Sequence, residues 1–333
     1  MLINLVPEFL DAIAGADPVA GYHRYFESHR ALLSAYWHNY VIEPTGPHFH
    51  EVVRDTVRAD RHDLHDLLAR LDVTALAARA EAACVEAFEL DVPVDVVLMV
   101  GVGAANAGEL VVDGRATAFV CLEHFTGVAN AATHGLGLDP ELLPMWLAHE
   151  IAHAVRYTAP TSRAELRRVV QAQQGFYSYW QTGKLVSLRE HLVNEGLAVQ
   201  AARALSPGHA EWEYFGFDRR QYARVRELEG VLRRLVAPDL DRTGLGLRLR
   251  WLSGGMSDVA GTIQRYVLPV RAEEIAGAFG EHIALDRARL VAHSTGEPAE
   301  AKAEAGAVEI GGDEPPEHPL EFTDPRVLPP VEP

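Results

Sequence analysis

The chain has 333 residues, of which 48% are hydrophobic, so it can bury a large core as one elaborate domain or two closely packed ones. Its formal net charge of −17 comes from 30 basic and 47 acidic side chains. Nucleic acids and anionic membranes attract basic patches, so this balance argues against both as partners. Only two cysteines occur, without the paired spacing of a disulfide framework or of a thiolate metal site.

The amino-terminal stretch MLINLVPEFLDAIAG does not resemble a signal peptide. It lacks the basic region that such a peptide needs, and it contains Glu8 and Asp11. No apolar run in the chain approaches the length of a membrane span. We therefore expect a cytoplasmic protein.

The two ends of the chain differ in character. Residues 1–90 are predicted to form a mainly helical region, because their apolar residues recur at helical spacing. Examples are Leu64, Leu67, Leu68 and Leu71. Residues 294–333 carry ten acidic residues and eight prolines against Lys302 and Arg326. Such a segment can bury little apolar area, so we expect a weakly structured, solvated tail.

Residues 91–293 are predicted to form the central domain. It begins with a β-rich part, in which VPVDVVLMVGVG and ELVVDGRATAFVCLEHF are rich in β-branched and aromatic residues. Asp113 and Gly114 predict a hairpin turn inside the second stretch. From Asp139 to about His293 the pattern is helical again. Helices, a small sheet and further helices predict an α+β protein.

The stretch MWLAHEIAHAVRYTAP sets His149, Glu150 and His153 into an apolar helix. Asp139 is predicted to cap this helix, with Pro140 at its first position. The two imidazoles are one turn apart and can reach one zinc ion. Glu150, turned by about 100°, can reach a water on that ion instead. A stripe on another face is expected to pack into the core through Leu143, Leu147, Ile151 and Val155.

A catalytic zinc needs a third protein ligand, and the best donor is Glu195. The extended pattern HExxHxxGxxH is absent, because Arg156 stands at its glycine. Glu195 lies in SLREHLVNEGLAVQAARAL, a helix that Ser187 and Glu190 begin with a capping box. It interrupts an apolar stripe formed by Leu188, Leu192, Val199 and Ala202. A carboxylate aimed into the core needs a cation, for which a buried arginine is the alternative to zinc. His191 is a rival ligand or a neighbour of the site.

An HExxH helix followed by a glutamate on a later helix is the pattern of the gluzincin metallopeptidases. WLAHEIAHAVR paired with LREHLVNEGLAVQAA most resembles a bacterial family described only as predicted zinc-dependent proteases of unknown function. The resemblance covers roughly residues 20–290, and its specific part is these two helices. NEGLA is also similar to a motif of certain zinc aminopeptidases, although 41 residues separate His153 from Glu195 here, which is more than they have.

The resemblance implies a zincin-like fold, in which a small β-sheet packs on the active-site helix, and a peptide or protein substrate. It implies Zn²⁺ as the cofactor, with His149, His153 and Glu195 as ligands and Glu150 as general base. Gluzincins commonly stabilise the oxyanion with a downstream Tyr or His. We take Tyr266 for this role, among candidates that also include Tyr214, Tyr222, His209 and His282.

Four further stretches of the sequence bear on the proposed site, and one alternative to a peptidase is open. The resemblance suggests ATAFVCLEHF as the edge strand along which a peptide substrate lies. The aromatic run GFYSYW could line a substrate pocket or form a lid, but aromatic residues in such a connection more often pack inside the fold. The histidines of GPHFHE and RHDLHD are expected to be surface or packing residues. The alternative to a peptidase is a non-catalytic helical scaffold in which the histidine–glutamate group is a structural metal site or a polar cluster.

Overall fold

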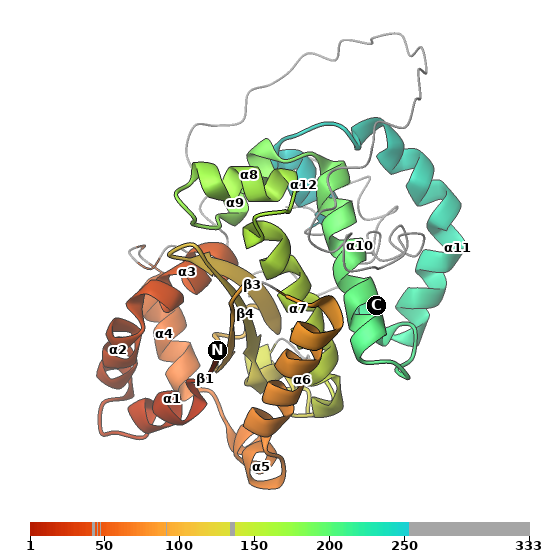
Figure 1. Ribbon diagram of the computed structural model, residues 1–333. Helices are drawn as coiled ribbons and strands as arrows, with labels where there is room; N and C mark the ends of the chain where they lie inside the picture. The colour runs from red at the N-terminus through yellow and green to blue at the C-terminus, as the bar shows by residue number, and fades with distance from the viewer. Residues whose placement is uncertain (42–43, 45, 47, 91, 134–136, 253–333) are drawn as a thin grey trace. The chain divides into compact units, whose positions relative to one another are not determined.

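The computed structural model describes residues 1–252 except 42–43, 45, 47, 91 and 134–136 (Figure 1). All described residues belong to one compact unit. None of the described helices combines the length and the apolar character that crossing a bilayer would require. The predicted tail, residues 294–333, lies outside the described residues.

The N-terminal region is helical, as its apolar spacing predicts, apart from one short strand. Strand β1 is Leu2–Asn4, and the helices that follow are α1 (Val6–Ile13), α2 (Pro18–Ser28), α3 (Arg30–Tyr40), α4 (Phe49–Arg58), α5 (His62–Arg70) and α6 (Val73–Phe88). The leucines of α5 that were expected to face the core do so, since Leu64 and Leu67 are fully buried. Strand β1 was not predicted, because three residues are too few for a period-2 pattern to be read.

The sheet has four strands in the order β1-β2-β4-β3. Strands β2 (Val94–Met99), β3 (Ala107–Val112) and β4 (Arg115–Cys121) follow one another in the chain. Strands β1, β2 and β4 run parallel, and β3 is antiparallel to β4. Asp113 and Gly114 form the predicted hairpin turn, and their positive φ angles of 50° and 74° are those of a type I′ turn. A protein of helices around this small mixed sheet is α+β, as predicted.

The expectation that ATAFVCLEHF forms the sheet edge beside the site is wrong. Its first part is β4, which pairs with β2 on one side and with β3 on the other. The edge strand next to β4 is β3, the first half of the hairpin, and β1 is the edge strand on the other side of the sheet. Asp113 and Gly114 predict that the two strands pair with each other, but they do not predict which of the two pairs with the rest of the sheet. That choice follows from burial, since six of the seven residues of β4 are buried.

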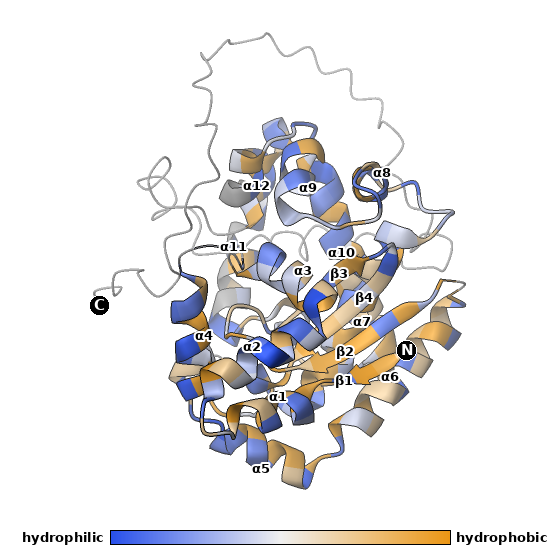
Figure 2. Ribbon diagram, turned by 90° about the vertical axis from the view of Figure 1, so that its left-hand side faces the viewer, coloured by the Kyte–Doolittle hydropathy of each residue, from blue (hydrophilic) through white to orange (hydrophobic). Residues whose placement is uncertain are grey.

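Six further described α-helices, three long and three of only seven or eight residues, follow the sheet in the chain. They are α7 (Leu143–Thr158), α8 (Glu165–Ala172), α9 (Tyr179–Leu185), α10 (Leu188–Leu205), α11 (Arg219–Val236) and α12 (Leu245–Leu252). Helix α7 packs against β4 and β3 on one side and against α10 and α6 on others, so it lies between the sheet and α10 (Figure 1). The strands that α7 covers are strongly hydrophobic (Figure 2).

The predicted apolar stripes of α7 and α10 are both confirmed. All eight of their residues are buried: Leu143, Leu147, Ile151 and Val155 on α7, and Leu188, Leu192, Val199 and Ala202 on α10. Because two helices and a sheet meet along these stripes, polar side chains on α7 and α10 that point toward each other are shielded from water. The fold therefore places the HExxH motif inside the protein.

Candidate metal centre

Helix α7 carries the first two candidate ligands and has the boundaries that its sequence indicates, with one difference. Asp139 accepts a hydrogen bond from the backbone N–H of Glu141, as a capping residue does. It caps a short 3₁₀ turn, Pro140–Leu142, and the α-helix itself begins at Leu143. The helix ends at Thr158, two residues before Pro160. His149 and His153 are thus four residues apart within regular helix, on one face.

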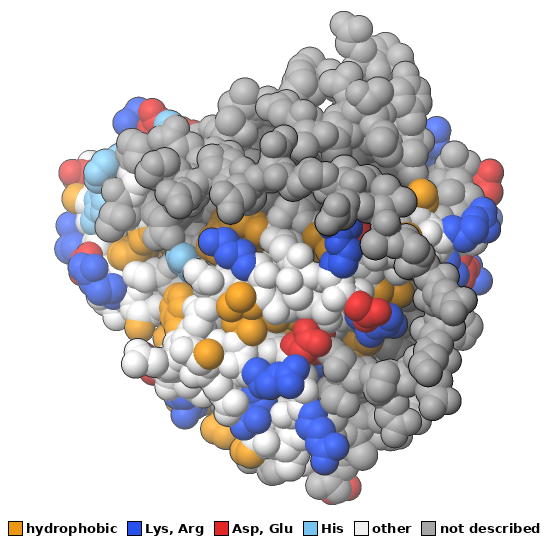
Figure 3. Space-filling view, turned by 90° about the horizontal axis from the view of Figure 1, so that it is seen from above, with side chains coloured by type: hydrophobic (Ala, Val, Ile, Leu, Met, Phe, Trp, Pro, Cys, Tyr) orange, Lys and Arg blue, Asp and Glu red, His pale blue; other side chains and the backbone are white. Residues whose placement is uncertain are grey.

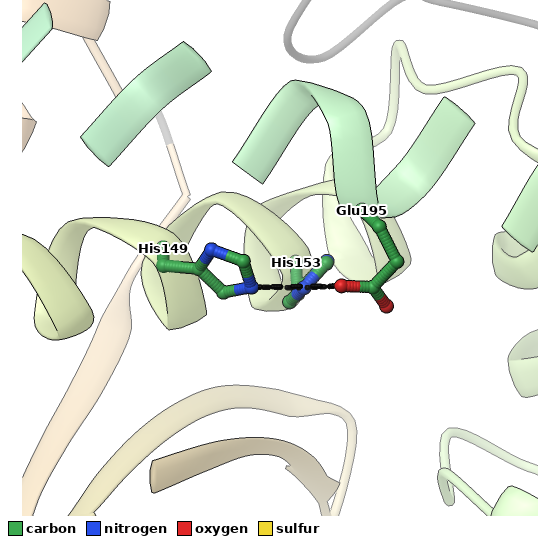
Figure 4. A group of neighbouring side chains, drawn as sticks. All are labelled: His149, His153 and Glu195. Atoms are coloured by element: carbon green, nitrogen blue, oxygen red, sulfur yellow. Dashed lines mark hydrogen bonds and ion pairs between the residues drawn. The ribbon is translucent and has the colours of Figure 1, made fainter. Parts of the chain in front are cut away.

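The side chains of His149, His153 and Glu195 point toward one position between α7 and α10 (Figure 4). The two Nε2 atoms are 3.1 Å apart. The Oε2 atom of Glu195 lies 3.4 Å from Nε2 of His153 and 3.6 Å from Nε2 of His149. Ligands about 2.0 to 2.1 Å from a tetrahedral zinc are about 3.3 Å from one another. The three donor atoms are therefore spaced as ligands of one zinc ion would be.

The electrostatics of this group favour a positive charge between the three side chains. Burial lowers the pKa of His149. Burial also acts to lower the pKa of His153, but the negative charge of Glu195 outweighs it and raises that pKa to about 10. Burial would raise the pKa of Glu195, whereas the two histidines hold it well below its usual value. A carboxylate that stays ionised at 17% exposure requires a nearby cation, which a metal ion or a proton can supply.

The second ring nitrogen of His153 is also engaged. Its Nδ1 atom lies 2.7 Å from Nδ2 of Asn194, the residue before Glu195. Arg156 donates to the Asn194 side-chain oxygen at 3.0 Å, and the amide nitrogen donates to the Tyr157 hydroxyl at 3.0 Å. Tyr157 in turn donates to a carboxylate oxygen of Glu109 on β3 at 2.8 Å. A hydrogen-bonded chain therefore orients His153 from both neighbouring elements, α10 and β3.

Arg156 and Glu190 form an ion pair at 2.7 Å between α7 and α10, with side chains only 1% and 0% exposed. Ser187 caps α10 as predicted, since its hydroxyl accepts from the Glu190 backbone N–H. The Glu190 carboxylate reaches Arg156 rather than completing the expected capping box. Burial raises the pKa of Glu190 to about 7, and the charge of Arg156 opposes this shift. The buried arginine that the sequence left open as a partner for Glu195 thus pairs with Glu190.

Glu150 follows His149 directly in α7. It is buried, with 5% exposure. Burial raises the pKa of Tyr40, at the end of α3, well above its usual value, and the charges of Glu109 and Glu150 add to this shift. The charge of Glu150 also acts to raise the pKa of His153, although Glu150 is not one of the three converging side chains. The general-base role of Glu150 stays a prediction from the sequence.

The other residues named from the sequence lie elsewhere or outside the described residues. Tyr266 and His282 are not among the described residues. Tyr214 donates to the Ser206 backbone and contacts His209 beyond the end of α10, and Tyr222 stacks on Phe215. His191 is buried, but the converging group found among the described residues does not include it.

The aromatic run between α7 and α10 packs partly inside the fold, with Tyr177 buried and Phe176, Tyr179 and Trp180 half-buried. The ring of Tyr177 stacks on Tyr157 at 5.1 Å, and Tyr157 stacks on His153 at 6.3 Å. Trp180 donates its indole N–H to the backbone of His38. The run therefore supports the site through Tyr157. A cavity of about 310 Å³ is lined by residues that include Met1, Glu81, Val85 and Ile151, and by none of the candidate ligands.

Sequence reasoning missed four residues that touch the site or its supports. Tyr157 and Asn194 had a local signal, because Tyr157 follows His153 by one helical turn and Asn194 precedes Glu195. Glu109 and Tyr40 had none, since each reaches the site from a distant part of the chain.

No family model matches the chain, and neither a curated protein nor a solved structure matches it. The site itself consists of two imidazole nitrogens and a carboxylate oxygen, all within 4.8 Å of one another, between two helices.

Proposed function

We propose that this protein is a zinc-dependent metallohydrolase of the gluzincin type, most simply a peptidase. His149, His153 and Glu195 would hold the ion, and Glu150 would act as general base. The single observation that carries the proposal is the convergence of the three donor atoms within 4.8 Å, with the HExxH glutamate adjacent but outside the group. One anionic and two neutral ligands are a common donor set for catalytic zinc.

The described residues also support a zincin-like arrangement. A mixed sheet with an antiparallel edge strand packs on the HExxH helix, and a later helix supplies the third ligand. The location that we propose, the cytoplasm, rests on the sequence alone. Tyr266 is proposed as the oxyanion donor on the strength of the resemblance alone.

In the proposed reaction, zinc would activate the water and the carbonyl group, and side chains of the protein would transfer the proton and hold the ligands. Zinc, when bound, lowers the pKa of water to about 7 and polarises a carbonyl group. Glu150 takes the proton of the attacking water and then delivers it to the leaving nitrogen. Asn194 and Tyr157 keep the His153 ring in place, and the buried Arg156–Glu190 pair holds the two ligand helices at a fixed distance.

The competing proposal is a structural metal site in a non-catalytic scaffold. It is favoured by the low exposure of the three side chains, which is 10%, 4% and 17% for His149, His153 and Glu195. A closed structural site would recruit a fourth protein ligand and would have no use for Glu150. The two proposals therefore differ in what happens when Glu150 alone is changed.

The first prediction is that Glu150→Gln keeps zinc and loses activity. Purified protein is expected to contain about one zinc per chain, because three ligands converge on one position. Cleavage of a peptide library of mixed lengths is expected to fall by about 10² or more in Glu150→Gln, which lacks the proton acceptor. His149→Ala and Glu195→Ala are expected to lose zinc as well as activity. Zinc content is measured by atomic absorption and cleavage by mass spectrometry.

Glu141→Gln is the matched control, because Glu141 is an exposed carboxylate in the turn that leads into the same helix. It is expected to change neither zinc content nor cleavage. A wild-type protein with full zinc occupancy that cleaves no member of the library would contradict the peptidase proposal and favour the structural site.

A further inference from the structure

Strand β3 is the sheet edge closest to the candidate site. Its residue Glu109 accepts a hydrogen bond from Tyr157, which stacks on His153. An open edge strand offers unpaired N–H and C=O groups, to which an extended peptide can add as a further strand. In an antiparallel pair, alternate residues direct these groups toward the partner and away from it. Glu109 and Val111 direct theirs away from β4, toward Tyr40 and Tyr177.

One hydroxyl group occupies both outward backbone groups of Glu109. The Tyr40 hydroxyl accepts from the Glu109 N–H at 3.0 Å and lies 2.9 Å from the Glu109 carbonyl oxygen. It also lies 2.9 Å from the Glu109 carboxylate, to which it can donate instead. Gly108 leaves the room for this contact, because a Cβ there would lie 2.5 Å from the Tyr40 hydroxyl oxygen. The side chain of Tyr40 thus takes the place that a substrate backbone would need.

The next outward group along β3 is occupied as well. The Tyr177 N–H donates to the Val111 carbonyl oxygen at 3.3 Å. Two residues earlier, the Gly175 carbonyl accepts from the Gly114 N–H in the hairpin turn at 3.1 Å. Residues 175–177 therefore lie along the end of β3 where an added strand would continue.

Hydrogen bonds connect the two segments that cover the edge, the end of α3 and the residues after α8. Asn39, next to Tyr40, donates to the Tyr177 carbonyl at 3.1 Å and accepts from the Tyr179 N–H at 2.7 Å. Trp180 donates to the His38 carbonyl at 3.1 Å. The Tyr40 ring also packs edge-on against Phe119 of β4, with centroids 5.0 Å apart. The end of α3 and the segment after α8 form one hydrogen-bonded cover over the edge.

We propose that Tyr40 and residues 175–177 determine the length of substrate that the site accepts. This inference rests on the proposed peptidase function and gives its substrate class. Because β3 cannot add a peptide strand at Glu109 and Val111, the site takes short peptides that bind without pairing to this edge. Extended segments of a polypeptide are poor substrates.

The test compares two sets of peptides that share one scissile bond and its flanking residues. The short peptides have about three residues, and the long ones have about ten, about 33 Å when extended, which exceeds the length of the edge. With zinc-loaded wild-type protein, kcat/KM is expected to be at least about tenfold higher for the short set, because the extra residues of a long peptide would have to displace Tyr40 or residues 175–177 and break their hydrogen bonds to the edge. In Tyr40→Ala this preference is expected to shrink.

Hydrogen exchange measures the closure of the edge without any substrate. In Tyr40→Phe, which keeps the ring, the Glu109 amide is expected to exchange at least about tenfold faster than in wild-type protein. Tyr36→Phe is the control, because the hydroxyl of Tyr36, on the same helix, accepts from the Val102 N–H rather than from β3. It should leave the exchange of Glu109 unchanged.

The outcomes separate this inference from the function on which it rests. Equal kcat/KM for long and short peptides in wild-type protein would overturn the length rule and leave the peptidase proposal intact. Unchanged Glu109 exchange in Tyr40→Phe would likewise show that Tyr40 does not close the edge. If zinc-loaded protein cleaves neither set, the peptidase proposal fails and the length rule fails with it.

Discussion

Two of the three side chains that contact the Asn194 amide, Arg156 and a metal-binding His153, would each need to donate to its oxygen. Arg156 donates to its oxygen, so the amide nitrogen faces Nδ1 of His153 at 2.7 Å. A histidine that ligates a metal through Nε2 carries its proton on Nδ1 and needs an acceptor there. The two contacts therefore compete for the single oxygen of the amide. A carboxylate at this position would offer an oxygen to each.

Asn194→Asp is predicted to bind zinc about tenfold more tightly than wild-type protein, because it accepts from both Arg156 and His153 and adds a negative charge near the ion. Asn194→Leu removes the contact at Nδ1 and is predicted to weaken binding by about 10- to 100-fold. Competition with a chromophoric chelator measures both affinities. Weaker binding by Asn194→Asp than by wild-type protein would show that Asn194 does not act through His153.

At the scale of elements, the site depends on the distance between α7 and α10. Helix α7 carries two of the candidate ligands and α10 the third, and each helix has its apolar stripe in the core. Between the helices lies the ion pair of Arg156 and Glu190, which is almost fully buried. Removing one partner of such a pair leaves a buried charge without compensation, whereas removing both leaves only a change in packing.

Arg156→Met and Glu190→Leu are each predicted to lower the free energy of unfolding by about 3–5 kcal/mol. The double variant is predicted to recover most of this loss. Urea denaturation of the three proteins measures the difference. Arg189→Met is the control, because Arg189 pairs with Asp241 at 2.6 Å on the surface, with side chains 40% and 78% exposed. Its loss should cost less than about 1 kcal/mol. Additive losses in the double variant would refute the coupling.

At the scale of the molecule, charge is unevenly distributed along the sequence. Ten of the 47 acidic residues fall in residues 294–333. On the described surface seen in Figure 3, acidic and basic side chains lie among one another. The described helices and sheet supply a continuous core of their own, which includes residues from β1 to α12. The stability of the fold is therefore expected to depend on the residues before the acidic segment.

Truncation after Ser294 is predicted to change Tm by less than about 2 °C, because the segment removed is rich in proline and acidic residues and poor in core-forming ones. Zinc content should also be unchanged, since all three candidate ligands precede residue 196. Scanning calorimetry and metal analysis of the truncated protein test this. A Tm lower by more than about 5 °C would mean that the segment packs on the folded part.

Local patterns were sufficient to predict several parts of this protein. The buried stripes of α7 and α10, the turn at Asp113 and Gly114, and the α+β class were all read correctly from periodicity and turn chemistry. Glu195 was found because a carboxylate interrupted an apolar stripe, and it converges with His149 and His153. Such features depend only on which face of an element is buried, and neighbouring residues specify that face.

The tertiary structure alone decided which faces meet. Tyr40 and Glu109 are separated by 69 positions, and Arg156 and Glu190 by 34, and no local pattern names either as the other's partner. The same holds for the edge of the sheet, because β4 and β3 carry similar β-forming residues and only the parallel pairing of β4 with β2 places β3 outside. Periodicity specifies that a face is buried, whereas the identity of the face opposite depends on how the whole chain packs.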